Sequence, residues 1–133
     1  MKKFEIHQYF GFTLVEMTLV VGIIGVLSAI ALPNLLRNRM SANEAMAQAT
    51  LKTIASALEN YYAVNTRYPA DTNTLLTSAP PYLNKDYFSG THGGFQFTAV
   101  LTDFSYSVNA APINANQGTK SYTITTGAVL SSP

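Results

Sequence analysis

The chain has 133 residues, with 8 basic and 7 acidic side chains, two histidines and no cysteine. A length of this order accommodates one domain rather than two. The balanced charge gives no electrostatic footprint for nucleic acid, and a chain without cysteine has no disulfide, thiolate metal site or thiol nucleophile.

The most prominent stretch is an apolar run from Phe12 to Leu32 that contains one ionisable side chain, Glu16. At 1.5 Å per residue, a helix of this length covers roughly 30 Å, about one hydrocarbon core. A carboxylate in such a helix costs about 2.5–3.5 kcal/mol by insertion scales, so we expect a cation to accompany it. The plainer alternative is a glutamate that reaches the membrane interface from near the helix start.

The segment before this run, residues 1–11, has no apolar core of its own. An ordinary secretory signal carries its apolar region before the cleavage site, whereas here that region would follow any cut and stay with the mature chain. Lys2 and Lys3 precede the run, and Arg37 and Arg39 follow it. The distribution of positive charge therefore leaves the orientation in a membrane nearly undecided.

The stretch Gly11-Phe-Thr-Leu-Val-Glu16, with the apolar run behind it, resembles the class III signal of type IV pilins and type II secretion pseudopilins. The resemblance implies that a prepilin peptidase cuts after Gly11 and methylates the new N-terminal residue, Phe12. The mature fifth residue of the family is a glutamate, here Glu16, and a proline often stands at the mature twenty-second position, here Pro33. Removal of residues 1–11 would leave six basic and six acidic side chains.

Such a cut would also supply a cation for Glu16, because the new α-amino group has an ordinary pKa of about 7.7–8.0. Residues 12 and 16 lie on neighbouring turns of one helix face, so the amine of the same chain is one candidate. The family's assembly model uses the amine of the next subunit instead, and paired charges in a low-dielectric bundle set register as much as strength. The resemblance thus implies a homo-oligomeric filament, held in the inner membrane before assembly. Its C-terminal part would lie outside the cytoplasm, and its partners would be a secretion or pilus assembly machinery.

Three residues mark positions at which the apolar helix can bend or lose backbone hydrogen bonds, namely Gly22, Gly25 and Pro33. Gly25 and Ala29 also form a small-xxx-small pair, a pattern that lets helices approach closely but is common by chance.

Beyond Pro33 the sequence predicts that the helix continues to about Val64 with an amphipathic face. Apolar residues recur there at three-, four- and seven-residue steps: Met40, Ala47, Leu51, Ile54, Leu58 and Tyr62 or Tyr61. We therefore divide the chain into a leader (1–11), a long helix (12–64) and a globular part (65–133). The helix is expected to span the membrane over 12–33 and to be amphipathic over 34–64.

The remaining sequence predicts a loop and then an antiparallel sheet. Pro69 ends the helix, and Asp71 or Thr72 can cap a short helix in the loop that follows. From residue 95, apolar and polar side chains alternate in three runs, 95–99, 104–108 and 122–125, separated by turn residues. The predicted fold class is α+β, a pilin-like lollipop in which a small sheet packs on the far half of a long helix.

No catalytic constellation stands out. His92 is the one histidine after the leader, and its Gly-rich turn favours an exposed side chain; a Ser-His-Asp site would need Asp86 or Asp103 beside it. Calcium binding is a minor hypothesis, because four residues with oxygen-bearing side chains lie in loops: Asp71, Asn73, Asp86 and Asp103. They do not form the Asp-x-Asp-x-Asp-Gly pattern of a calcium loop. We expect no enzyme and no cofactor.

From the sequence we expect a structural subunit of a membrane-anchored filament, of the type II secretion pseudopilus or type IV pilus kind. The alternative is a single-pass, membrane-anchored binding module or enzyme of the cell envelope. A chain without cysteine departs from the many major type IV pilins that have a C-terminal disulfide, which favours a pseudopilin or a cysteine-free pilin.

Overall fold

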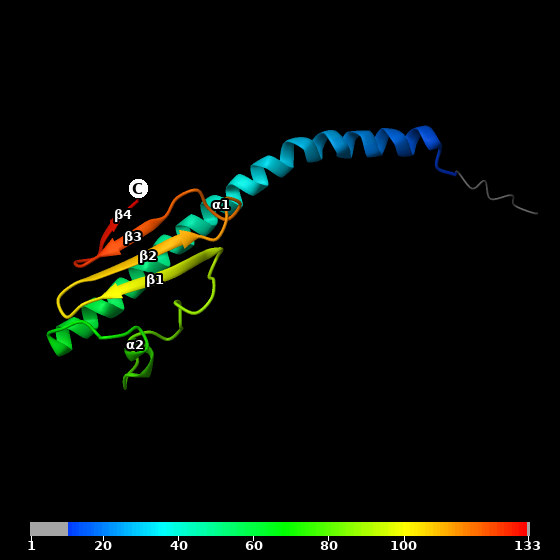
Figure 1. Cartoon of the computed structure of the whole chain (residues 1–133). Coiled ribbons are helices and arrows are strands. Elements are labelled where there is room, and N and C mark those ends of the chain that lie inside the picture. The colour runs from blue at the N-terminus through cyan, green and yellow to red at the C-terminus, as the bar shows by residue number, and fades with distance from the viewer. Residues whose placement is uncertain (1–10, 133) are drawn as a thin grey trace, which may run out of the picture. The chain divides into compact units, whose positions relative to one another are not determined.

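The computed structural model describes residues 11–132 (Figure 1). Its elements in chain order are α1 (Leu14–Asn65), α2 (Thr74–Thr77), β1 (Phe95–Leu101), β2 (Tyr106–Pro112), β3 (Tyr122–Thr125) and β4 (Val129–Ser131). The chain divides into two compact units, residues 1–35 and 36–133, with the boundary inside α1. A long helix followed by an antiparallel sheet confirms the predicted α+β class. The predicted leader, 1–11, lies outside the described residues apart from Gly11.

Helix α1 begins at Leu14, two residues later than predicted, because Thr13 serves as its N-cap. The Oγ1 of Thr13 accepts a hydrogen bond from the backbone N–H of Glu16 at 3.2 Å, and the Thr13 carbonyl accepts one from Met17 N at 3.2 Å. The pattern Thr-x-x-Glu is typical of a capping box, and the Thr13 side chain satisfies one backbone donor that the first turn leaves unpaired.

Within the first unit, α1 runs unbroken through Gly22, Gly25 and Pro33. Its large apolar side chains are exposed on every side, among them Leu14, Val15, Met17, Leu19, Val21, Ile23, Ile24, Val26, Leu27, Ile30, Leu32 and Leu35. A helix that is apolar all round is stable only where apolar surroundings cover it. Within residues 11–132, α1 is the one helix long and apolar enough to cross a membrane.

In the second unit, one face of α1 packs against the sheet. The buried side chains of α1 are Ala47, Leu51, Ile54, Ala55, Ala57 and Leu58. Fully buried Phe95, Val108 and Ile124 meet them from β1, β2 and β3. Burying an aliphatic or aromatic side chain of this size stabilises by about 1.5–3 kcal/mol, so this contact is the main source of the unit's stability.

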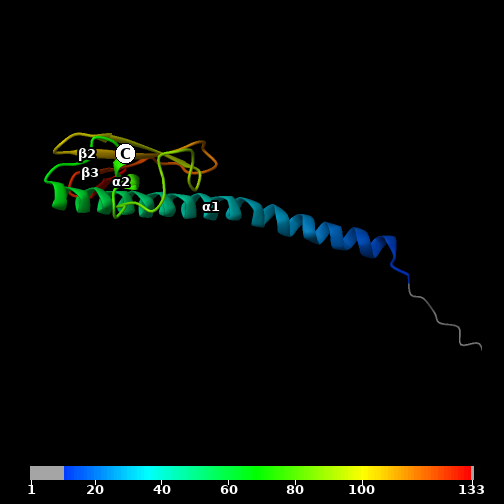
Figure 2. The same cartoon turned by 90° about the horizontal axis from the view of Figure 1, so that it is seen from below.

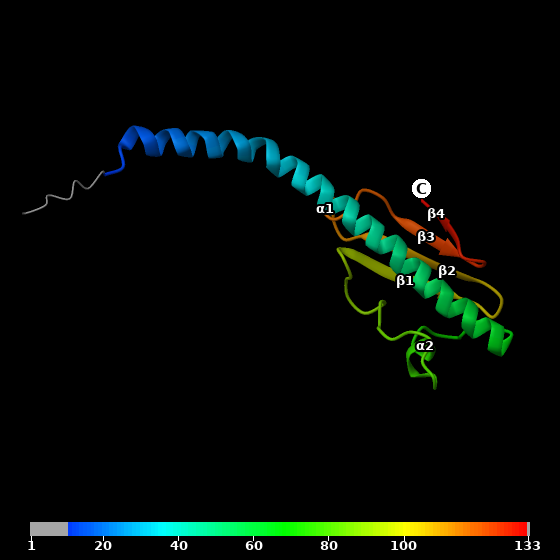
Figure 3. The same cartoon turned by 180° about the vertical axis from the view of Figure 1, so that it is seen from behind.

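The four strands form one antiparallel sheet in the order β1-β2-β3-β4. Figure 2 shows the sheet as a layer along the C-terminal part of α1, and Figure 3 shows α1 crossing its inner face. The register places Phe97 opposite Ala110 and Val108 opposite Ile124, so the inward side chains of neighbouring strands form continuous rows. The alternation in β1, β2 and β3 thus sets which sheet face covers the helix.

Of the two tyrosines that the sequence offered for the end of the apolar face, Tyr61 is half-buried and Tyr62 is 36% exposed. Two details differ from the sequence prediction. Phe104 does not start a strand but lies in the β1–β2 turn, 75% exposed, because Thr102 and Ser105 close that turn through their hydroxyls and backbone. The short strand β4 was not predicted, since its three residues are too few to show an alternation.

The segment between α1 and β1 is irregular apart from α2. Asp71 Oδ1 accepts hydrogen bonds from Thr74 N and Thr74 Oγ1, both at 2.8 Å, so Asp71 supplies the predicted cap although Asn73 is the residue directly before the helix. Leu75 is fully buried, and its carbonyl accepts the backbone N–H groups of Tyr82 and Leu83 at 2.9 and 3.0 Å. Helix α2 therefore anchors the segment between α1 and β1 to the core.

Candidate functional site

The first candidate site is the junction at the start of α1. Gly11 and Phe12 precede the helix, and the Phe12 side chain is 73% exposed. No atom of the described chain lies within 4 Å of the place where a side chain on Gly11 would begin. The backbone between the two residues is therefore uncrowded and non-helical, as a protease substrate must be.

Glu16 lies in the first turn of α1 and is exposed. It forms no ion pair within residues 11–132, and it is the only ionisable residue of α1 before Arg37. Its backbone N–H completes the Thr13 cap, while its carboxylate stays available to a cation. The Thr13 cap therefore uses only the backbone of Glu16, and within residues 11–132 no contact occupies its carboxylate.

An apolar hollow on one face of α1 follows this junction. It is lined by Leu14, Met17, Thr18, Val21 and Gly22, which recur every three or four residues. A Cβ on Gly22 or Gly25 would meet nothing within 4 Å. Packing within the described chain therefore does not require a glycine at either position. Close approach of a second helix would be a reason for a small residue there.

In the second unit, Glu44 joins α1 to the loop between β2 and β3. Its Oε1 accepts hydrogen bonds from Thr119 N at 2.8 Å and Thr119 Oγ1 at 3.0 Å, and its Oε2 accepts one from the Tyr122 hydroxyl at 3.2 Å. The hydrogen bonds from Thr119 hold the pKa of Glu44 below its ordinary value, although partial burial works in the opposite direction. Burial, together with the Glu44 charge, raises the pKa of Tyr122.

Glu59 makes a similar connection four turns further along α1. It accepts hydrogen bonds from the hydroxyls of Tyr68 and Tyr106, at 3.2 and 3.1 Å, and from Gly127 N at 2.9 Å. Burial raises the pKa of Tyr68 and of Tyr106 to about 12, and the Glu59 charge adds to both shifts. Glu59 therefore ties the helix to the loop after it, to β2 and to the β3–β4 turn.

Sequence reasoning did not single out Glu44 or Glu59, and it missed both connections. The available signal was the number of tyrosines at inward positions of the strands, because a buried hydroxyl needs a partner.

His92 is not the exposed loop histidine that the sequence predicted. It is half-buried, because its backbone N–H and carbonyl both pair with Phe95 and draw the turn against the sheet. Its ring lies edge-on to Tyr87 at 5.6 Å between centroids, and its Nε2 is buried with no hydrogen-bond partner in the described chain. The hydroxyl of Ser89 donates to Asp86 and not to His92, so these residues do not form a nucleophile–base pair.

The acidic loop residues considered for calcium have local structural contacts. Asp71 caps α2, and Asp86 accepts hydrogen bonds from Phe88 N and Ser89 N at 2.8 and 3.2 Å. The carbonyl of Asp103 accepts Tyr68 N at 3.0 Å. Within residues 11–132, no three acidic or histidine side chains gather in a group that could hold a metal ion.

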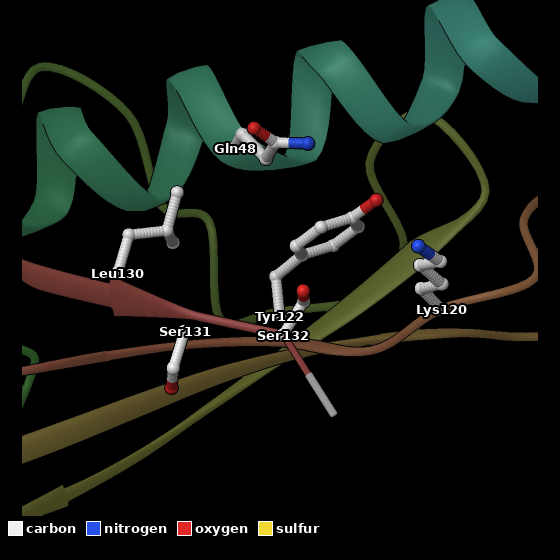
Figure 4. Close-up of a pocket in the computed structure, with 6 residues that line it drawn as sticks. All are labelled: Gln48, Lys120, Tyr122, Leu130, Ser131 and Ser132. Atoms are coloured by element: carbon white, nitrogen blue, oxygen red, sulfur yellow. The ribbon is translucent and has the colours of Figure 1, made fainter.

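A cleft of about 290 Å³ opens beside strand β4 (Figure 4). Its lining comes from Gln48 on α1, from Lys120 and Tyr122 around the start of β3, and from Leu130, Ser131 and Ser132. The Tyr122 hydroxyl is already committed to Glu44, and Ser131 Oγ donates to the Thr123 carbonyl at 3.3 Å. The cleft is polar, and it lacks the arrangement of nucleophile, base and orienting group that catalysis needs.

The helix start, the exposed apolar half of α1 and the α+β second unit are the features that the resemblance to pilins and pseudopilins implies. The family model for the prokaryotic N-terminal methylation motif matches residues 7–32, which include Gly11, Phe12 and Glu16. This match confirms the resemblance expected from the sequence.

The relatives of the chain include type IV pilins and core proteins of type II secretion systems. Type II secretion system core protein G of Klebsiella pneumoniae is 39% identical over 72 residues, which cover 53% of this chain and 51% of that protein. The type IV major pilin protein PilA of Myxococcus xanthus is 35% identical over 65 residues, or 49% of this chain and 30% of that protein. The type IV wide pilus major component PilA4 of Thermus thermophilus is 36% identical over 67 residues, which cover 50% of this chain and 51% of that protein. The chain thus spans about half the length, or less, of these relatives.

Proposed function

We propose that this chain is a structural subunit of a membrane-anchored filament of the type II secretion pseudopilus or type IV pilus kind. A prepilin peptidase cuts between Gly11 and Phe12 and methylates the amine of Phe12. The apolar half of α1 holds the subunit in the inner membrane with residues 36–133 on the periplasmic side, until the subunit is polymerised through α1.

The observation that carries the proposal is the coincidence of three features at one place. The methylation motif covers residues 7–32, an uncrowded Gly11–Phe12 junction lies directly before a capped helix, and that helix is apolar on every side for more than twenty residues. A soluble domain would not keep such a surface exposed, since contiguous apolar patches of this kind mark contacts with membranes or proteins.

Assembly in this proposal is driven by burial of the apolar half of α1 among like helices. Gly22 and Gly25 let the helices approach, and Pro33 gives α1 a place to bend as the bundle forms. Glu16 sets the axial register, because in a bundle of low dielectric its carboxylate is stable only beside a cation such as the Phe12 amine of a neighbour.

Intact mass spectrometry tests the processing step on protein produced with a prepilin peptidase and recovered from membranes. The proposal predicts a mass that lacks residues 1–11 and carries one additional methyl group. A chain that still begins at Met1 would contradict it and would favour the single-pass anchored module instead.

Variants at the helix start test the role of Glu16. Glu16→Gln keeps the side-chain shape and the capping pattern but removes the charge, so we expect normal cleavage and loss of incorporation into filaments. Thr13→Ala is the matched control, since it removes the cap at a cost of about 1 kcal/mol but leaves the charge in place. If Glu16→Gln assembles as well as the unchanged protein, the charge does not set register.

A further inference from the structure

A small pocket of about 100 Å³ lies where the first turns of α1 in the second unit meet the loop between β2 and β3. Leu36, Arg39 and Asn43 line it from α1, and Asn116 and Gln117 line it from the loop. Because the three helix residues are spaced by three and four positions, they lie on one face of α1, whereas Arg37 lies on another. Neither the methylation motif nor the homology assigns a role to this pocket.

The walls of the pocket are fixed by contacts within the protein. Asn43 Nδ2 donates to the Gln117 carbonyl at 3.2 Å and to Gln117 Oε1 at 2.9 Å. Asn114 Oδ1 accepts Asn116 N at 3.1 Å, which closes the loop turn. On the other side, Gly94 lies so close that a Cβ there would overlap the Gln117 side chain. The pocket is therefore a preformed feature of the fold.

The pocket presents a cationic group that no carboxylate of the described residues neutralises. Arg39 forms no ion pair with any carboxylate of residues 11–132. The nearest acidic residue along the helix, Glu44, already accepts three hydrogen bonds from Thr119 and Tyr122. A guanidinium beside the side-chain amide of Asn116 is a donor set that suits the oxygens of a phosphate group.

The pocket also has an apolar edge. Leu36 lines it and is 56% exposed, so an occupant that carries an apolar tail beside its anionic group would cover more of the site than a free anion would. Arg39 follows the last residue of the apolar run, Leu32, by seven positions, about 10 Å along a helix. That distance is close to the range over which a membrane's surface charge acts at physiological salt.

We propose that this pocket binds the phosphate headgroup of an anionic phospholipid while the subunit is held in the membrane. Arg39 forms the charged hydrogen bonds, Asn116 adds a neutral donor, and Leu36 contacts the start of an acyl chain. The inference rests on the membrane anchoring in the proposed function and adds a lipid specificity to it.

The experiment uses the full chain in vesicles of phosphatidylcholine, or of phosphatidylcholine and phosphatidylglycerol in equal amounts. After extraction in a mild detergent, mass spectrometry measures the ratio of the two lipids that remain with the protein. Measurement at about 1 M salt shortens the screening length to about 3 Å, so general attraction between basic residues and the membrane surface is suppressed.

Arg39→Gln is compared with Arg37→Gln, its matched control, because both remove one exposed positive charge at nearly the same position in the chain. We expect phosphatidylglycerol to be enriched on the unchanged protein and on Arg37→Gln. Arg39→Gln should lower that enrichment about tenfold, the equivalent of about 1.4 kcal/mol, because it removes the hydrogen bonds from a charged group. Asn116→Ala should lower it too, and unchanged near-UV circular dichroism would show that the loop is intact.

Equal enrichment in Arg39→Gln and Arg37→Gln would overturn the lipid inference while leaving the anchoring untouched. Displacement of phosphatidylglycerol by millimolar inorganic phosphate would also overturn it, because it would identify a site for the free anion. A chain that fails to float with phosphatidylcholine vesicles alone would refute the anchoring itself, and with it the proposed function and this inference together.

Discussion

Replacing Glu59 with alanine tests how the second unit is held to its helix. The carboxylate is the acceptor for two tyrosine hydroxyls and for Gly127 N, and both tyrosines, Tyr68 and Tyr106, are about 96–97% buried. A buried hydroxyl that loses its partner costs about 1–3 kcal/mol, so two of them together with the Gly127 N–H imply a loss of about 2–4 kcal/mol in the free energy of unfolding. The lower part of this range allows for water that replaces the carboxylate at its exposed side.

Urea unfolding of the full chain in detergent micelles measures this loss. The chain has no tryptophan, so tyrosine fluorescence and near-UV circular dichroism follow the transition, and linear extrapolation gives the free energy. Glu59→Gln is the matched variant, because its side-chain oxygen still accepts one hydroxyl, and its loss should be about half as large.

A double-mutant cycle with Tyr106→Phe separates the contribution of the Glu59–Tyr106 hydrogen bond from other effects of the Glu59 substitution on stability. Once Glu59 is alanine, removal of the Tyr106 hydroxyl should cost at least 0.5 kcal/mol less than it does in the unchanged protein, since the hydroxyl is then already unpaired. Additive losses, or a loss below about 0.5 kcal/mol for Glu59→Ala alone, would refute the reasoning.

Three further predictions follow from the same contacts. The pKa of Glu44 is lower in the folded state than its ordinary value of 4.5, so the ionised carboxylate stabilises the fold at pH values above 4.5. The free energy of unfolding should therefore fall as the pH drops through and below 4.5. Glu44→Gln should weaken this acid dependence when the urea midpoint is measured as a function of pH. The raised pKa values of Tyr68 and Tyr106 predict a loss of stability as the pH rises from about 10 to about 12, and Tyr106→Phe should reduce that slope in the same assay. Gly118→Ala should lower the free energy of unfolding by about 1–3 kcal/mol, because the new Cβ would lie 2.5 Å from the ring of fully buried Phe95. Thermal unfolding of Gly118→Ala beside the unchanged protein measures this loss, and an unchanged midpoint would contradict the predicted clash.

The sequence predicted the features that depend on a repeated pattern. The apolar run, the buried Leu51 and Ile54, and the alternation through Phe95 and Phe97 each repeat a physical preference several times, so a single exception does not obscure them. The candidate processing site was predictable for a different reason, since a fixed spacing between glycine, phenylalanine and glutamate needs no tertiary information.

The features that sequence reasoning missed depend on partners that are far apart along the chain. Glu44 contacts Thr119, 75 positions away, and Glu59 contacts Gly127, 68 positions away. Nothing in the local sequence distinguishes these two glutamates from solvated residues of a polar helix face. The error at Phe104 has a different, local origin: its alternation with Tyr106 suggests a strand, but hydrogen bonds between Thr102 and Ser105, three residues apart, make a tight turn there.

The late start of α1 has a consequence for the chain that processing would leave. A cut before Phe12 would put a positive amine two residues from the first helical residue, Leu14, at the end where the aligned peptide dipoles already carry partial positive charge. Methylation of that amine would not remove its charge. The carboxylate of Glu16 in the first turn opposes this accumulation within a single subunit. The residue that we propose sets register between subunits would then also keep the first turn of a newly cut helix from fraying before any neighbour arrives.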